Sequence, residues 1–138
     1  MATLVVGYDG TEGAHASLHT ATQLASELHD DIVAVFAFTI SRLGGEVSDY
    51  ATTVREHGET VLQEAKRVAA EAGVAIDTVL LEHSIAEALI EVADERDARM
   101  IVVGSYGERP LKSALVGSTP TRLLHLSERP VLVVRAPE

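Results

Sequence analysis

Two glycine-containing segments in the C-terminal third of the chain have the residue types and spacing of a phosphate-binding loop. Gly104-Ser-Tyr-Gly107 directly follows the apolar run Met100–Val103, and Gly117-Ser118-Thr119 begins after nine further residues. Glycine lets backbone N–H groups approach an anion closely because it has no Cβ. A helix expected to begin near Pro120 adds unpaired N–H donors and a positive dipole. The spacing therefore predicts phosphate binding, and a nucleotide is the first candidate ligand.

A carboxylate and two basic side chains accompany these glycines. Asp9 lies in the turn Tyr8-Asp9-Gly10, directly after the apolar strand expected at Leu4–Gly7. A carboxylate there accepts hydrogen bonds from ribose hydroxyls but is poorly suited to touch phosphate. Arg109 and Lys112 lie inside the glycine loop and have the charge needed to neutralise a β- or γ-phosphate.

The elements that must position these residues are visible as apolar runs alternating with amphipathic stretches. Strands are expected at Leu4–Gly7, Ile32–Phe38, Ala75–Glu82, Met100–Val103 and Val131–Val134. Helices are expected at Glu12–His29, before Gly73, after a capping box at Ser84–Glu87, and at Pro120–Leu126, with Ser118 and Thr119 as caps of the last one. Residues 41–50 are read as a connecting segment.

Four of the five strands are continuous apolar runs, which is typical of parallel strands buried on both faces. The sequence therefore predicts a single α/β domain over residues 1–138: a doubly wound, five-stranded parallel sheet of order 3-2-1-4-5 with helices on both faces. In that order the turn at Asp9 and the glycine loop after Met100–Val103 face each other at the carboxyl ends of the strands, where such sheets bind ligands.

The composition narrows the possible partners. The formal net charge is −10, from 21 acidic against 11 basic residues, which disfavours nucleic acid and anionic membranes as partners. The chain contains no cysteine, so disulfides, thiolate catalysis and cysteine zinc sites are excluded. No signal-like segment opens the chain and no apolar run approaches the roughly 20 residues of a membrane span. We therefore expect a cytoplasmic protein.

Other ligand motifs fit less well. The first turn reads Gly7-x-x-Gly10-x-x-Gly13, and the second strand ends Phe38-Thr39-Ile40 without an acid, so a dinucleotide fingerprint is absent. The segment from Gly107 to Ser113 lacks the second glycine of a P-loop. His15 and His19 are four residues apart on one helix, but no third metal ligand is identifiable. We read these histidines as helix-surface residues and predict no metal site.

The pattern G-x2-G-x9-G-[ST] after the fourth strand resembles the ATP-binding motif of the universal stress protein family. The likeness extends over the whole chain, including Val6-Gly-Tyr-Asp9-Gly after the first strand and Arg129-Pro130 before the last. The resemblance implies a Rossmann-like adenine-nucleotide-binding fold that is often a homodimer and acts in stress responses. It implies ATP, with or without Mg²⁺, as the ligand.

Site residues follow from the same resemblance, position by position. Asp9 matches a residue at the sugar and base region, with backbone help from Gly7 and Tyr8, and Ala37 matches an adenine contact. The two halves of the phosphate loop correspond to Gly104, Tyr106 and Gly107, and to Gly117, Ser118 and Thr119. The chain departs from the family at Tyr106, where a basic or imidazole side chain is common, and at Pro120, which removes a backbone donor.

The last strand suggests a homodimer. An edge strand without a charge or bulge tends to pair with another strand, and this one consists of Val131, Leu132, Val133 and Val134. Cover from elsewhere in the chain is the alternative. Antiparallel pairing with a second copy is favoured, and the resemblance implies the same dimer.

Three functional hypotheses remain open at this level. Hydrolysis of ATP requires a positioned base beside the γ-phosphate. Asp9 is the carboxylate expected in the crevice, at the ribose end, and Glu108 has no identifiable partner. A nucleotide-binding regulatory or sensor protein is therefore favoured over an enzyme. The alternatives are a dimerising interaction module without functional nucleotide binding, and a slow ATP hydrolase.

Overall fold

The computed structural model describes residues 2–40, 47–105 and 117–136, and within them five parallel strands form one sheet of order β3-β2-β1-β4-β5. The strands are β1 (Thr3–Gly7), β2 (Asp31–Phe38), β3 (Ile76–Glu82), β4 (Met100–Gly104) and β5 (Val131–Val134). The helices are α1 (Glu12–Leu28), α2 (Val47–Glu71), α3 (Ile85–Glu95) and α4 (Ser118–Leu126). The predicted strand order and α/β class are confirmed.

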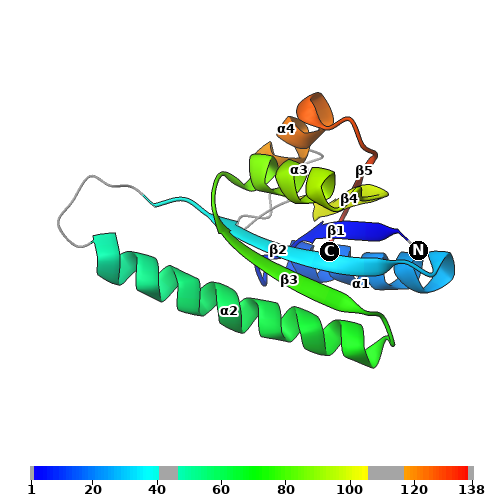
Figure 1. The fold of residues 1–138 in the computed structure, drawn as a ribbon, viewed down its shortest axis with the longest axis horizontal. Helices are drawn as coiled ribbons and strands as arrows, with labels where there is room; N and C mark the ends of the chain where they lie inside the picture. The colour runs from blue at the N-terminus through cyan, green and yellow to red at the C-terminus, as the bar shows by residue number, and fades with distance from the viewer. Residues whose placement is uncertain (1, 41–46, 106–116, 137–138) are drawn as a thin grey trace.

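The helices cover both faces of the sheet, with α1 and α2 on one face and α3 and α4 on the other (Figure 1). Alternate side chains of β1 belong to the two layers. Leu4 and Val6 lie in the core under α1 and α2, whereas Val5 lies in the core under α3 and α4. All three are fully buried, which explains why this strand reads as a continuous apolar run.

The central position of β1 sets the location of any ligand site. It pairs with β2 on one side, Gly7 opposite Val35, and with β4 on the other, Val6 opposite Val102. The direction of winding reverses between β1 and β4, so α1, which follows β1, and α4, which follows β4, lie on opposite faces of the sheet. A crevice at such a reversal is where open α/β sheets bind ligands.

Two helices begin earlier than the sequence pattern predicted. α2 begins at Val47, so residues 47–50 belong to the helix and not to a connecting segment. The negative charge of Asp49 in the first turn interacts favourably with the positive end of the helix dipole. α4 begins at Ser118 and not at Pro120. Pro120 is tolerated as the third helical residue because the first four N–H groups of a helix have no partner within it.

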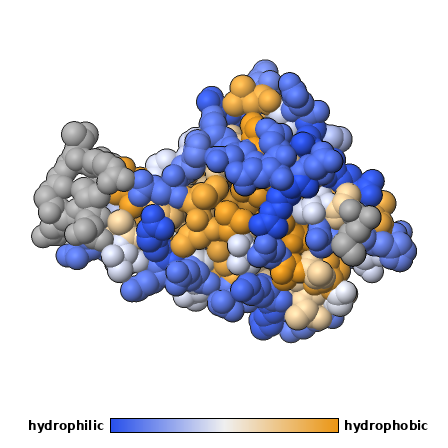
Figure 2. Space-filling model, in the orientation of Figure 1, coloured by the Kyte–Doolittle hydropathy of each residue, from blue (hydrophilic) through white to orange (hydrophobic). Residues whose placement is uncertain are grey.

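The surface shown in Figure 2 is apolar between α3 and α2, over the β3 edge of the sheet. Val79 and Leu81 of β3 are half-buried and pack against the core under α3. β3 is therefore an edge strand, as predicted. None of the helices in the described ranges combines the length and apolar composition that crossing a membrane requires.

Candidate functional site

The two ends of the glycine loop are joined by a backbone hydrogen bond. The N–H of Gly117 donates to the carbonyl of Ser105 (2.7 Å), and the N–H of Ser105 donates to Val134 of β5 (2.9 Å). The first residues of α4 therefore lie directly beside the carboxyl end of β4. This is the arrangement that the phosphate-loop prediction requires, although Tyr106, Gly107, Arg109 and Lys112 lie outside the described residues.

The N-terminus of α4 differs in detail from the prediction. Gly117 is the N-cap, with its carbonyl accepting from the N–H and the hydroxyl of Thr121 (3.2 and 2.9 Å). The prediction that Ser118 and Thr119 cap this helix is wrong, because both lie inside its first turn and α4 has no side-chain cap. As first-turn residues they have N–H groups that the helix itself cannot satisfy. Gly117, in contrast, has already donated its N–H.

A cleft of about 360 Å³ opens at this helix end. The described residues that line it come from the end of β2, from the first turn of α3 and from the start of α4: Phe38, Thr39, Ser84, Ile85, Ala86, Glu87, Ser118, Thr119 and Arg122. Its volume lies near the lower limit for small-molecule sites, about 300 Å³. Two helix N-termini therefore meet one cleft, and each contributes a positive dipole end.

A three-residue polar cluster spans this cleft from α3 to α4. The hydroxyl of Ser84 donates to the carboxylate of Glu87, and Arg122 donates to the same carboxylate through its Nε. These two hydrogen bonds, that from Ser84 first, lower the pKa of Glu87 to about 2, so the carboxylate is ionised at neutral pH. Ser84 is the N-cap of α3, as predicted, but the capping box is wrong because its hydroxyl binds the side chain of Glu87 and no backbone N–H.

Asp9 is held in the turn before α1. Its Oδ1 accepts from the N–H (3.1 Å) and the hydroxyl (2.6 Å) of Thr11, which is the N-cap of α1. Asp9 is not among the described residues that line the cleft; the carboxylate there is Glu87. Glu87 was not predicted as a site residue, because Ser84–Glu87 reads as a local capping box in the sequence. A ligand contact of Asp9 stays a prediction.

Gly104 packs directly against the first turn of α1. A Cβ at this position would lie 2.7 Å from both the carbonyl carbon and the oxygen of Gly13. At Gly7, by contrast, a Cβ would meet only the side chains of Leu89 and Val103, at 3.3 and 3.4 Å. Close packing of α1 on the sheet is therefore sufficient reason for glycine at position 104. Contact of Gly104 with a ligand stays a prediction.

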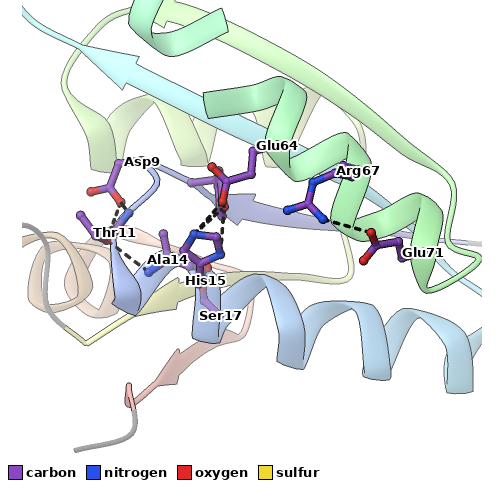
Figure 3. A network of polar contacts seen from close by, with 9 residues as sticks. Asp9, Thr11, Ala14, His15, Ser17, Glu64, Arg67 and Glu71 are labelled. Atoms are coloured by element: carbon purple, nitrogen blue, oxygen red, sulfur yellow. Dashed lines mark hydrogen bonds and ion pairs between the residues drawn. The ribbon is translucent and has the colours of Figure 1, made fainter. Parts of the chain in front are cut away.

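The side chain of Tyr8 lies in the protein interior, and a backbone contact of Tyr8 with a ligand stays a prediction. Its N–H donates to the carbonyl of Val35 (2.9 Å), and its side chain is 2% exposed. The phenol donates to Glu64 of α2 (3.2 Å) and contacts His15 of α1, which itself lies 2.7 Å from Glu64 (Figure 3). Burial, and then the charge of Glu64, raise the pKa of this phenol. His15 therefore belongs to a network between two helices and is not simply a helix-surface residue.

Ala37, the remaining predicted position, is next to a residue that lines the cleft but does not line it itself. Ala37 is half-buried in β2, opposite Leu81 of β3 and next to Phe38, which does line the cleft. Ser105 is 1% exposed and its hydroxyl has no hydrogen-bond partner in the part of the chain that the structure describes. Within that part, no three His, Asp or Glu side chains lie close enough together to hold a metal ion.

The fold and the cleft define the class of this protein: an open-sheet α/β protein whose candidate ligand site lies beyond the carboxyl ends of its parallel strands. The chain belongs to the universal stress protein family, whose family model matches residues 1–135.

Individual relatives agree with this assignment. Universal stress protein YxiE of Bacillus subtilis is 31% identical, and the alignment covers 96% of this chain and 97% of YxiE. A universal stress protein solved in complex with cAMP is 26% identical, with a TM-score of 0.77 and coverage of 99% of this chain and 98% of that one. A universal stress protein of Archaeoglobus fulgidus, solved with dAMP, shares the fold at 20% identity, a TM-score of 0.75 and coverage of 97% and 98%.

Proposed function

We propose that this protein binds an adenine nucleotide, with ATP as the principal ligand, and that it acts as a regulatory or sensor protein in a stress response. The observation that carries the proposal is the cleft in which the first turns of α3 and α4 meet beside the carboxyl ends of the strands. The relative solved with cAMP, which is 26% identical to this chain, supports adenine as the base.

The chemistry of the cleft suits an anionic ligand with an apolar end. Ser118 and Thr119 present first-turn N–H groups and hydroxyls, which together accommodate phosphate oxygens. Ile85, which is 44% exposed, supplies apolar surface in the lining, whereas the ring of Phe38 packs in the core under α1 and α2. An adenylate fits both features of the cleft. Its flat base can lie against apolar surface, and its phosphate can lie at a helix N-terminus.

The same lining argues for binding without efficient hydrolysis. Glu87 is the sole carboxylate among the described residues of the lining, and it already accepts hydrogen bonds from Ser84 and Arg122. A carboxylate whose pKa lies at or below its ordinary 4.5 is a weak general base at neutral pH, with or without Arg122 beside it. We therefore propose a regulatory protein and no dedicated ATPase; Mg²⁺ would accompany ATP as its counter-ion.

Isothermal titration of the purified protein with ATP, AMP, cAMP and adenosine tests the proposal. We expect micromolar binding of at least one adenine nucleotide, abolished in Gly117→Val because a branched side chain then stands at the start of α4. Ser26→Leu, on the exposed surface of α1, is the matched control and should bind normally. Absence of binding at millimolar nucleotide would instead favour the interaction-module hypothesis. Phosphate release with Mg²⁺ measures turnover, and rapid turnover would contradict a regulatory role.

We also propose that the protein is a homodimer paired through β5. β5 is an edge strand, and α4, which packs on it, exposes Leu124 and Leu126 at 60% and 47%. The carbonyl of Pro130 accepts from Ile101 of β4, and that of Val134 accepts from Ser105, directly after β4. The backbone groups of Val133, which alternate with these, therefore face the open edge.

Val133→Pro is the variant that separates edge pairing from folding. Proline removes an N–H that faces the open edge and leaves the hydrogen bonds between β5 and β4 intact. We expect a monomer by sedimentation velocity with an unchanged circular dichroism spectrum, whereas Val133→Thr should remain dimeric. A wild-type protein that is monomeric at micromolar concentration would overturn the dimer.

A further inference from the structure

The ion pair between Arg122 and Glu87 occupies the wall of the candidate nucleotide cleft. Arg122 is four residues after Ser118, so the two side chains lie on the same face of α4, and both line the cleft. Glu87 approaches from the first turn of α3, on the other side. The pair therefore joins the two helices at the place where the phosphate groups of a bound nucleotide would lie.

The guanidinium of Arg122 has unused capacity for an anion. Its side chain is 60% exposed, and its contact with Glu87 is made through Nε. An arginine has five N–H donors in a planar fork that matches the geometry of phosphate oxygens. Ser118 and Thr119, one turn earlier, supply the neutral donors that would complete the coordination of the same group.

Glu87 has the opposite effect on such a ligand. Its carboxylate is ionised at neutral pH, as that of an ordinary glutamate is, and Ser84 and Arg122 both donate to it. A phosphate that enters the cleft therefore meets a carboxylate of the same charge, already bound to the cation that the phosphate needs. Ser84 can continue to hold the Glu87 carboxylate if Arg122 leaves it.

We propose that Arg122 is a phosphate-binding cation of this site, and that the nucleotide takes Arg122 from Glu87 when it binds. This inference rests on the proposed adenine-nucleotide site and adds the residues that set its preference for phosphorylated ligands. Glu87 then acts as an internal competitor that weakens the binding of every phosphorylated ligand and leaves the unphosphorylated nucleoside unaffected.

Titration of four single variants with ATP and with adenosine tests the exchange. Arg122→Gln should weaken ATP binding about tenfold, the loss expected for a hydrogen bond to a charged group, and leave adenosine unchanged. Glu87→Gln should tighten ATP binding about fivefold, the effect of removing one like charge a few ångströms away in water. Arg67→Gln and Glu71→Gln are the matched controls, because these residues form an exposed ion pair on α2, remote from the lining.

One more variant and a comparison of outcomes separate a loss of the Arg122 contact from damage to α4 and from failure of the nucleotide site. Arg122→Lys retains the charge and should recover part of the ATP affinity, which excludes general damage to α4 as the cause of the loss. If Arg122→Gln and Glu87→Gln match their controls while the wild-type protein binds ATP and Gly117→Val does not, the exchange is overturned and the nucleotide site stands. If the wild-type protein binds neither ATP nor AMP nor cAMP, the proposed function fails, and the exchange fails with it.

Discussion

Replacement of Gly104 by alanine tests whether close packing of α1 on the sheet requires glycine at this position. The new Cβ would lie 2.7 Å from the carbonyl carbon and from the oxygen of Gly13, and 3.1 Å from its Cα. These are backbone atoms in the first turn of α1, so no side-chain rotation relieves the contact. The helix end or the strand end must move instead.

The expected cost follows from two opposing terms. Overpacking of a close-packed interior costs about 1–3 kcal/mol. Alanine also restricts the unfolded chain, which stabilises the folded state by about 0.4–1 kcal/mol where the backbone conformation is compatible. The net expectation for Gly104→Ala is a loss of about 1–2 kcal/mol in the free energy of unfolding.

Gly7→Ala is the matched control. Gly7 ends β1 as Gly104 ends β4, but a Cβ there meets the side chains of Leu89 and Val103 at 3.3 and 3.4 Å, and those can shift by rotation. We expect a change of less than about 1 kcal/mol. Equilibrium unfolding in urea measures both variants. Equal stability of Gly104→Ala and Gly7→Ala would refute the argument that contact with α1 dictates glycine at position 104.

Two further predictions concern buried polar groups. Asp30 is fully buried and accepts from Arg99 (2.6 Å) and from the N–H of Ala2 (3.0 Å); the hydrogen bond from Arg99, first, lowers its pKa below the usual 3.8. The stability that this carboxylate contributes is therefore complete above about pH 4 and declines as the pH falls through the lower folded-state pKa. Urea unfolding of wild-type protein and Asp30→Asn between neutral and acidic pH should show a difference that shrinks on acidification, and a constant difference would contradict this. The buried Tyr8 should remain protonated at about pH 11, above the usual tyrosine pKa of about 10, because burial and Glu64 raise its pKa. Absorbance titration of wild-type protein minus Tyr8→Phe measures this, and an ionisation near pH 10 in the difference would show that the phenol is not buried.

Much of the fold could be predicted from the pattern of apolar residues. Runs such as Leu4–Gly7 and Met100–Val103 contain no polar residue because strands in the centre of a parallel sheet are covered on both faces. Gly104 and Gly117 could likewise be placed at one edge of the sheet from the sequence. Parallel strands of known order bring their carboxyl ends to a common edge.

Helix starts were less predictable than strands. Val47–Tyr50 reads as part of a connection in isolation, and Pro120 looks like the first residue of a helix. Contacts with β2 and β3 stabilise α2 as a whole, although Asp49 and Tyr50 near its start are exposed, and the hydrogen bond between Gly117 and Ser105 holds the start of α4. Such tertiary contacts override local signals because helices in proteins are stabilised mainly by packing.

The detailed chemistry of the cleft depends on contacts between residues that are far apart in the sequence. Ser84 and Glu87 look like a local capping box in the sequence. In the structure Arg122, 35 residues after Glu87, donates a hydrogen bond to the Glu87 carboxylate. His15 looks like a surface residue until α2 brings Glu64 beside it. The sequence pattern is enough to predict a layered sheet with a phosphate-type loop, because burial and backbone freedom leave local signatures. Only the folded chain determines which charged side chains meet, because ion pairing depends on distance in space and leaves no periodic trace in the sequence.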